Sequence, residues 1–237
     1  MSVDLEEMSA FFNNRALQYD SVHVATIDGG AESKRVLASF FPENAETLID
    51  LGIGTGLELE AIFARFPDIR VTGYDIAEGM LKLLAEKYPG KTLDLRLESY
   101  LSADFGRGAY DAALSVMTLH HYGHEAKTAI YRKIFDCLRP GGVYIECDYI
   151  LSDYEYDDPQ KAEDEIFERC RQLRAEQSLD GGAEYHFDTP CTVGNQKKML
   201  ASAGFREIKE VWQIKNTIVL TATKQNNLES CRISSSP

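Results

Sequence analysis

The sequence predicts an α/β protein: a doubly wound, mostly parallel sheet of seven strands with a closing antiparallel strand pair, plus a helical cap. Short apolar runs alternate with segments of helical periodicity from residue 47 to residue 150. Two adjacent strand-like runs then close the chain, at residues 205–214 and 216–224. Because parallel crossovers return right-handed over a sheet, this alternation predicts helices on both of its faces.

The individual elements follow from apolar spacing and from the residues that interrupt it. The first five expected strands are residues 47–51, 69–75, 91–98, 111–119 and 143–150. The expected helices between them are residues 57–66, 77–88 and 127–138, each followed by a proline within three residues. A further helix is expected at residues 160–178, and another ends near residue 203.

This pattern divides the chain into three expected parts. Residues 1–46 read as a helical lid that packs outside the sheet. Residues 47–224 form the sheet domain, with a cap inserted at about residues 152–193, where Asp180 opens a loop. Residues 225–237 have little to bury, and we expect them to form a mobile tail.

Composition excludes several classes of protein. Of 237 residues 44% are hydrophobic, and 25 Lys and Arg against 38 Asp and Glu give a net charge of −13. That charge disfavours nucleic-acid and membrane partners. Five scattered cysteines, an acidic N-terminus and the lack of a long apolar run predict a soluble, cytoplasmic protein. A homodimer is compatible with the sequence.

A glycine-rich turn follows the first expected strand. Its glycines, Gly52, Gly54 and Gly56, would let the backbone approach a ligand closely. A dinucleotide fingerprint needs glycine where Leu57 stands, so hydride transfer with a nicotinamide cofactor is the weaker interpretation. Asp75 ends the second strand, where its carboxylate could accept hydrogen bonds from ribose hydroxyls or cap the next helix.

Four segments together carry a family resemblance. IDLGIGTG, GYDIAEGM, YDAALSVMTLHH and CLRPGGVYIE, in that order, resemble the motifs of class I S-adenosylmethionine-dependent methyltransferases. The resemblance is strong over residues 45–150. It implies a Rossmann-like fold, S-adenosylmethionine as cofactor and in-line transfer of a methyl group to a small molecule.

The resemblance also implies a set of cofactor-binding residues. Asp50 and the three glycines would surround the methionine end, Asp75 would hold the ribose, and Ile76 and Met80 would lie beside the adenine. In the adenine segment, where the family usually has Asp, this chain has Glu98, Ser99 and Tyr100. Residues 115–118, beginning with Ser115, would pass beneath the sulfonium, and Tyr19 and Arg15 resemble lid residues.

Three histidines are candidates for catalysis. His120 and His121 follow the fourth strand, where one of them could act as a base or simply hydrogen-bond loop backbone. His186 stands in a segment that could fold over the pocket, whereas His124 is expected to cap a helix or face solvent. The histidines and carboxylates show no known metal-ligand spacing, so no metal is predicted.

An acidic stretch from Glu146 to Glu168 contains ten carboxylates and one lysine, interleaved with Tyr149, Tyr154 and Tyr156. It could be a solvated face, or it could favour an amine or other cationic acceptor. Two alternatives to methyl transfer stay open: a non-catalytic or regulatory protein that binds the same cofactor, and an enzyme that uses this cofactor for another reaction.

Overall fold

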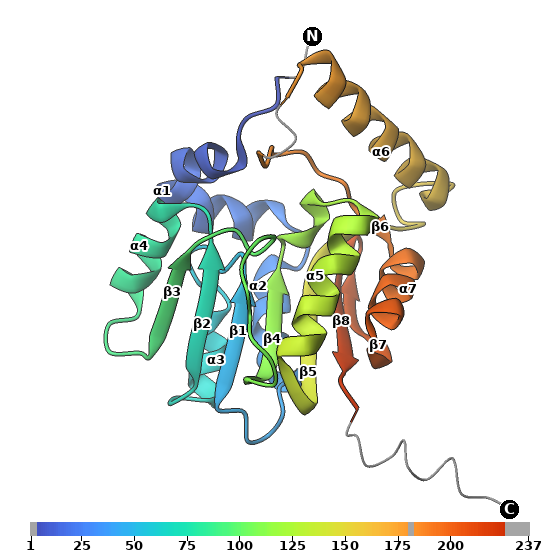
Figure 1. Cartoon of the computed structure of the whole chain (residues 1–237). Helices are drawn as coiled ribbons and strands as arrows, with labels where there is room; N and C mark the ends of the chain where they lie inside the picture. The colour runs from blue at the N-terminus through green and yellow to red at the C-terminus, as the bar shows by residue number, and fades with distance from the viewer. Residues whose placement is uncertain (1–3, 180–182, 226–237) are drawn as a thin grey trace, which may run out of the picture.

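The computed structural model describes residues 4–179 and 183–225, and its centre is a twisted sheet (Figure 1). Seven strands follow one another in the order β3-β2-β1-β4-β5-β8-β7. The pairs from β3 to β5 are parallel, whereas β8 runs antiparallel to β5 and to β7. The predicted fold class is therefore confirmed. The expected tail and the Asp180 turn lie outside the described residues, apart from residue 225.

The elements agree with most of the expected segments. The strands are β1 Thr47–Leu51, β2 Arg70–Asp75, β3 Leu93–Leu97, β4 Tyr110–Val116, β5 Leu138–Leu151, β6 Cys191–Thr192, β7 Arg206–Ile214 and β8 Thr217–Thr223. The helices are α1 Met8–Thr26, α2 Gly30–Leu37, α3 Leu59–Arg65, α4 Glu78–Lys87, α5 His124–Cys137, α6 Pro159–Glu176 and α7 Val193–Ala203, with short 3-10 turns η1 Ala38–Phe40 and η2 Leu119–His121.

Two elements differ from the prediction. β5 begins at Leu138 instead of Val143, because Tyr110 of β4 already pairs with Leu138 and the ladder resumes after a register shift. The two-residue strand β6 was not predicted. It pairs with Ile150 and Leu151 at the end of β5, and so short a strand leaves no periodic signal.

Helices cover both faces of the sheet, as the alternation predicts. On one face, Ile49 of β1 belongs to a core with Ile134 of α5 and Leu200 of α7. On the other face, Leu48 belongs to a core with Ile62 of α3. Neighbouring residues of β1 therefore face opposite cores, which explains why all five of its residues are buried.

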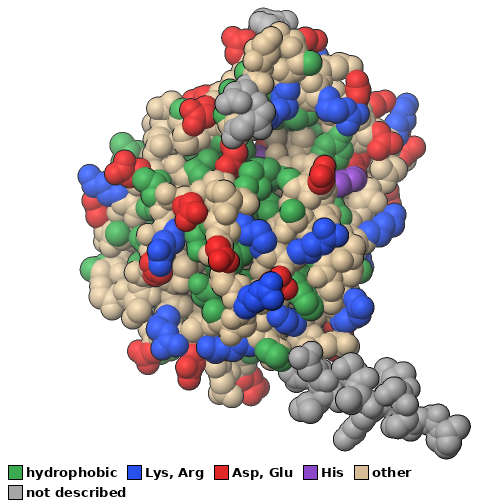
Figure 2. Space-filling view, in the orientation of Figure 1, with side chains coloured by type: hydrophobic (Ala, Val, Ile, Leu, Met, Phe, Trp, Pro, Cys, Tyr) green, Lys and Arg blue, Asp and Glu red, His purple; other side chains and the backbone are tan. Residues whose placement is uncertain are grey.

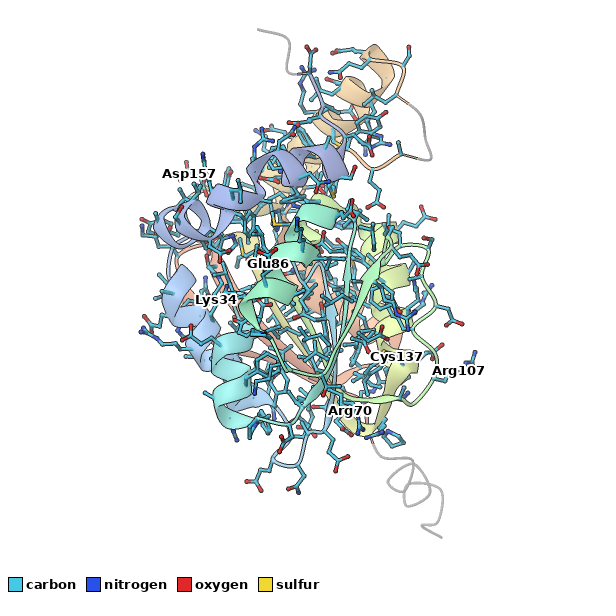
Figure 3. The ribbon with its side chains drawn as sticks, turned by 90° about the vertical axis from the view of Figure 1, so that its left-hand side faces the viewer. Lys34, Arg70, Glu86, Arg107, Cys137 and Asp157 are labelled. Carbon is cyan, nitrogen blue, oxygen red and sulfur yellow. The ribbon has the colours of Figure 1, made fainter. Side chains whose placement is uncertain are left out.

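The carboxyl ends of the parallel strands meet at one edge. Leu51 at the end of β1 pairs with Tyr74 of β2 and with Ser115 of β4. The strand order reverses between β1 and β4, which is where open α/β sheets bind ligands. Figure 3 shows Arg70, at the start of β2, at the lower end of the sheet, and α1 crossing above the opposite end.

The N-terminal segment is fastened to the loop before β6. Glu7 and Tyr185 form an antiparallel bridge, flanked by hydrogen bonds from Met8 N to Glu184 O and from His186 N to Glu6 O, both 2.9 Å. We call residues 183–190 the cap loop. Because of this bridge, α1 and the cap loop approach the carboxyl edge of the sheet together.

The surface of the face drawn in Figure 2 carries Lys and Arg interspersed with Asp and Glu. Within residues 4–179 and 183–225, no helix is long and apolar enough to span a membrane.

Candidate active site

Two neighbouring cavities lie at the carboxyl edge of the sheet. The glycine-turn cavity is lined by twelve residues, among them Gly52, Gly54, Asp75, Tyr100 and Thr118. The histidine cavity has a volume of about 590 Å³ and is lined by His120, His121, His186, Asp188, Tyr149 and residues of α1. Phe12, Tyr19 and Met117 line both cavities, so the two are separated by shared side chains.

The glycine turn has the backbone conformation that its sequence suggests. Gly52, Gly54 and Gly56 all have positive φ, between 53° and 66°. A Cβ added at Gly52 would lie 2.3 Å from Thr118 Oγ1, so a side chain there would collide with the residue that follows β4. Gly56 is required for packing instead, because a Cβ there would lie 3.0 Å from Leu59 and Leu84.

Asp75 ties the end of β2 to this turn. One of its carboxylate oxygens accepts a hydrogen bond from Gly54 N and the other from Ala77 N, both at 2.8 Å. Burial raises the pKa of Asp75, although these backbone hydrogen bonds oppose that shift. Ala77 is the N-cap residue of α4, so Asp75 holds the turn that leads into this helix, and it also lines the cavity. The ribose contact of Asp75 stays a prediction, and α4 itself has no side-chain cap from the described residues.

Asp50 is buried within β1 and is not among the twelve residues that line the glycine-turn cavity. Neither of its carboxylate oxygens has a hydrogen-bond partner among the described residues. Burial, and next the nearby Glu58, raise the pKa of Asp50 well above its ordinary value. Glu58 lies with Lys34, Tyr19 and the glycine turn around a smaller adjoining cavity.

The remaining expected cofactor residues divide into two groups. Ile76, Met80 and Tyr100 line the glycine-turn cavity. Glu98 is exposed, and Ser99 donates a hydrogen bond to Glu184 of the cap loop. Two further positions take other partners: Ser115 bonds Tyr144 at 2.6 Å inside the core, whereas Arg15 lines the histidine cavity and pairs with Glu6 at 3.1 Å.

Sequence reasoning missed two residues of this site, Glu184 and Asp188, and included Met117 only within the segment 115–118. Met117 adopts a positive φ of 50° and lines both cavities. Such a conformation is costly for a residue other than glycine, so its neighbours must enforce it. Glu184 accepts hydrogen bonds from both Ser99 and Tyr122, and Asp188 faces the histidines. Both carboxylates belong to the cap loop, whose position no periodic pattern predicts.

The histidines cluster around Asp188. His120 Nδ1 lies 2.5 Å from Asp148 Oδ1, and its Nε2 lies 3.6 Å from Asp188 Oδ1. Burial alone would lower the pKa of His120, but Asp148 and Asp188 outweigh it and hold this pKa above its ordinary value. For His121, burial and the charge of His120 lower the pKa to about 4. His121 is therefore neutral at pH 7.

His186 and His124 occupy different surroundings. The imidazole of His186 stacks on Phe11 with ring centroids 3.5 Å apart and borders the histidine cavity. His124 begins α5 and hydrogen-bonds Glu163 of α6. His124 thus connects two helices.

The acidic stretch separates into buried and exposed parts. Glu146 accepts hydrogen bonds from Tyr131 and Gln196, and Glu163 accepts one from Thr192 N at 2.7 Å. Asp153 lines a separate cavity with Pro159. Tyr149 lines the histidine cavity, and its hydroxyl donates to Glu155 at 2.8 Å.

Comparison with known proteins supplies the family. Residues 48–142 match the model of a family described as "Methyltransferase domain". This match and the relatives described below support a class I S-adenosylmethionine-dependent methyltransferase. Its cofactor is S-adenosylmethionine, and the recognition made from the four motifs is confirmed.

The names of individual relatives of this methyltransferase refer to different reactions. Carboxy-S-adenosyl-L-methionine synthase of Campylobacter lari is 25% identical over 93% of this chain and 96% of its own length. 24-Methylenesterol C-methyltransferase 2 of Oryza sativa is 28% identical over 49% of this chain and 32% of its own. Human N-acetylserotonin methyltransferase, solved with the cofactor, shares the fold with a TM-score of 0.66 and 16% identity, covering 93% of this chain and 59% of its own.

The residues at the carboxyl edge fit this cofactor. The unpartnered buried oxygens of Asp50 suit a group that carries ammonium hydrogens, which the methionine end supplies. Gly52 and Thr118 line the glycine-turn cavity side by side, and this close packing requires glycine, because a Cβ at Gly52 would lie 2.3 Å from Thr118 Oγ1.

Proposed function

We propose that this methyltransferase transfers the methyl group of S-adenosylmethionine to a small-molecule acceptor bound in the histidine cavity. One observation carries the proposal: Phe12, Tyr19 and Met117 line both the glycine-turn cavity and the histidine cavity. A cofactor in the first cavity would therefore adjoin an acceptor in the second. Methyl transfer needs this adjacency, because the nucleophile must approach the methyl carbon opposite the sulfur.

The residues around the glycine-turn cavity would hold the cofactor. Gly52 and Gly54 would take the methionine end beside Asp50, and Asp75 would accept hydrogen bonds from ribose hydroxyls. Each oxygen of Asp75 already accepts one backbone hydrogen bond and has a second lone pair for a hydroxyl. Three further residues would contact the adenine: Ile76, Met80 and Tyr100.

The histidine cavity suits a small molecule with an apolar body and one polar end. Its volume of about 590 Å³ is within the usual range of small-molecule pockets. Phe11, Phe12 and Tyr149 form aromatic walls, and the histidines lie at one end. The acceptor would place its nucleophilic atom among the histidines, toward Met117.

When bound, the cofactor supplies an electrophilic methyl group on a positively charged sulfur. Phe12 and Tyr19 would exclude water from the reacting atoms, and correct positioning alone can contribute about 7–11 kcal/mol. The neutral imidazole of His121 would form a hydrogen bond with an acceptor hydroxyl. A base is needed only if the acceptor atom carries a proton that must leave. For that role the candidates are His120, His121 and His186.

The amine version of this proposal has less support. Asp153 lines a separate cavity, and Glu155 reaches the histidine cavity only through Tyr149. The histidine cavity itself is lined by one carboxylate, Asp188, and one guanidinium, that of Arg15. This balance gives little attraction for a cation.

A second candidate is carboxylation of the cofactor itself. The relative that matches this chain over almost its whole length is named for making carboxy-S-adenosyl-L-methionine. In that case a C–H bond of the cofactor's methyl group would break with loss of a proton, and a new C–C bond would form to a carboxyl group taken from a second substrate that acts as carboxyl donor. A homodimer also stays a prediction.

Mass spectrometry separates these candidates. The full chain is incubated with S-adenosylmethionine labelled in its methyl group and with fractions of a metabolite extract. Methyl transfer predicts S-adenosylhomocysteine together with a labelled acceptor. Carboxylation predicts a labelled cofactor that is heavier by carbon dioxide, and tight cofactor binding without either product indicates a regulatory protein. Either of the last two results contradicts the proposal, as would measurable binding of NAD alone in calorimetry.

A further inference from the structure

The histidine cavity holds a set of side chains with the composition of a metal site. His120, His121 and Asp188 each offer one ligand atom, and these three atoms lie within 4.8 Å of one another. Asp188 Oδ1 is 3.0 Å from His121 Nδ1 and 3.6 Å from His120 Nε2. Ligands bound at 2.0–2.1 Å to one tetrahedral ion are separated by about 3.3 Å. Both distances from Asp188 Oδ1 to the imidazole nitrogens are therefore close to the separation that one ion requires.

The orientation of His120 agrees with such a site. Its Nδ1 lies 2.5 Å from Asp148 Oδ1, which directs Nε2 toward Asp188. Histidine ligands commonly donate their second N–H to a carboxylate in this way, because the hydrogen bond fixes the tautomer and the ring orientation. The side chain of Asp148 is 1% exposed, so this partner is held rigidly within β5.

His121 supplies an independent observation. Its side chain is 4% exposed, and its Nδ1 makes no hydrogen bond of acceptable geometry, although Asp188 Oδ1 lies 3.0 Å away. A protonated His120 would explain, without a metal, why the carboxylates of Asp148 and Asp188 lie on either side of its ring. It would leave the buried, unpartnered nitrogen of His121 unexplained. A cation between His121 and Asp188 would satisfy both.

We propose that His120, His121 and Asp188 bind one divalent transition-metal ion, of the zinc or ferrous class, in the wall of the histidine cavity. Two imidazoles and one carboxylate are the ligand types that these ions take in sites with an open position. All three residues line the cavity, so the open position faces the space assigned to the acceptor. His186 Nε2, 3.8 Å from Asp188 Oδ1, stands beside it.

The proposed metal site also indicates which atom of the acceptor is methylated. This part of the inference rests on the proposed function. An acceptor that fills the open position would bind through oxygen, as a hydroxyl or carboxylate. Such ions lower the pKa of a bound hydroxyl and so make it a better nucleophile. An oxygen acceptor follows from this site, and an amine does not.

Cobalt binding tests the site without any turnover. The full chain is stripped with a chelator and titrated with Co²⁺, followed by visible absorption, and Zn²⁺ is then added as a competitor. We expect one Co²⁺ per chain, displaced by Zn²⁺. Asp188→Ala and His121→Gln should each lower the affinity at least tenfold. Asp188 has a side-chain exposure of 55%, so its removal does not threaten the core.

Two further variants sharpen the result. His124→Gln is the matched control, because His124, Glu163 and Cys191 form the other grouping of ligand atoms among the described residues. It should leave Co²⁺ affinity unchanged. Asp148→Asn removes a positioning residue and should weaken Co²⁺ binding about 10–100-fold. Absence of binding, equal binding by Asp188→Ala, or loss of binding in His124→Gln would overturn the site.

Calorimetry on the metal-free protein separates this inference from the proposed function. S-adenosylhomocysteine should bind the stripped chain, and Asp188→Ala should leave that affinity unchanged. Cobalt binding without methyl transfer would contradict the proposed function and leave the metal site standing. Methyl transfer by a chain that binds no cobalt would do the reverse.

Discussion

The carboxylate of Asp75 accepts a hydrogen bond from the backbone N–H of Gly54 at 2.8 Å. This bond joins the turn after β1 to the end of β2, two segments that lie 21 residues apart in the sequence. Asp75 and Gly54 also line the same cavity. The two motifs that resemble cofactor-binding segments therefore form one connected surface, and changes in either motif should alter the other.

Substitution of Gly52 tests the shape of that surface. Gly52→Ala should abolish measurable cofactor binding and lower the thermal unfolding midpoint, because its Cβ would lie 2.3 Å from Thr118 Oγ1. Backbone strain at φ +66° adds about 1–3 kcal/mol. Gly90→Ala is the control, since Gly90 also has a positive φ but no atom lies within 4 Å of its added Cβ. Equal effects of the two substitutions would contradict the steric argument.

Substitution of Glu184 tests whether the cap loop closes over the glycine-turn cavity. Its carboxylate accepts hydrogen bonds from Ser99 and Tyr122, two residues beside that cavity. A hydrogen bond to a charged group contributes about 1.5–3 kcal/mol, so Glu184→Gln should raise the dissociation rate of S-adenosylhomocysteine about tenfold. Stopped-flow displacement measures this rate. Glu176→Gln, at the exposed end of α6, should leave it unchanged.

The buried carboxyl group of Glu146 should make the stability of the protein depend on pH. Burial, and next Asp148, raise its pKa from an ordinary 4.5 to about 8. Between these two values the folded chain holds a proton that the unfolded chain releases. The free energy of unfolding should therefore fall as pH rises through this window, by up to about 1.4 kcal/mol per pH unit, and level off above it.

Glu146→Gln should flatten that dependence, because an amide of the same shape does not titrate. Thermal unfolding of both chains between pH 5 and pH 9, followed by circular dichroism, is the measurement. Parallel curves for the two chains would mean that Glu146 does not hold the proton.

The sheet could be predicted well from the sequence because each strand leaves a pattern within a few consecutive residues. β1, in which Leu48 and Ile49 are buried on opposite faces of the sheet, is a short and mostly apolar run that ends at a glycine. The glycine turn and Asp75 could likewise be recognised, since each lies within a few residues of a strand end. The antiparallel pair β7 and β8 was visible for the same reason.

The acceptor side could not be predicted in this way. Asp188 meets His120 and His121 only through the fold of the cap loop, 67 residues further along the chain. Spacing rules for metal ligands read neighbours in sequence, so they miss this grouping. Arg15 was expected at the cofactor, but Glu6 and the carbonyl oxygen of Phe11 hold its guanidinium beside the histidine cavity.

The central claim is that Asp75 and the glycine turn together hold S-adenosylmethionine. Calorimetric titration of Asp75→Asn with S-adenosylhomocysteine tests it most directly, with Asp94→Asn, on the exposed part of β3, as the matched control. Loss of a charged hydrogen-bond acceptor predicts a dissociation constant about 10–100-fold higher for Asp75→Asn and unchanged for Asp94→Asn. Equal affinity of Asp75→Asn and the unaltered chain would contradict the account.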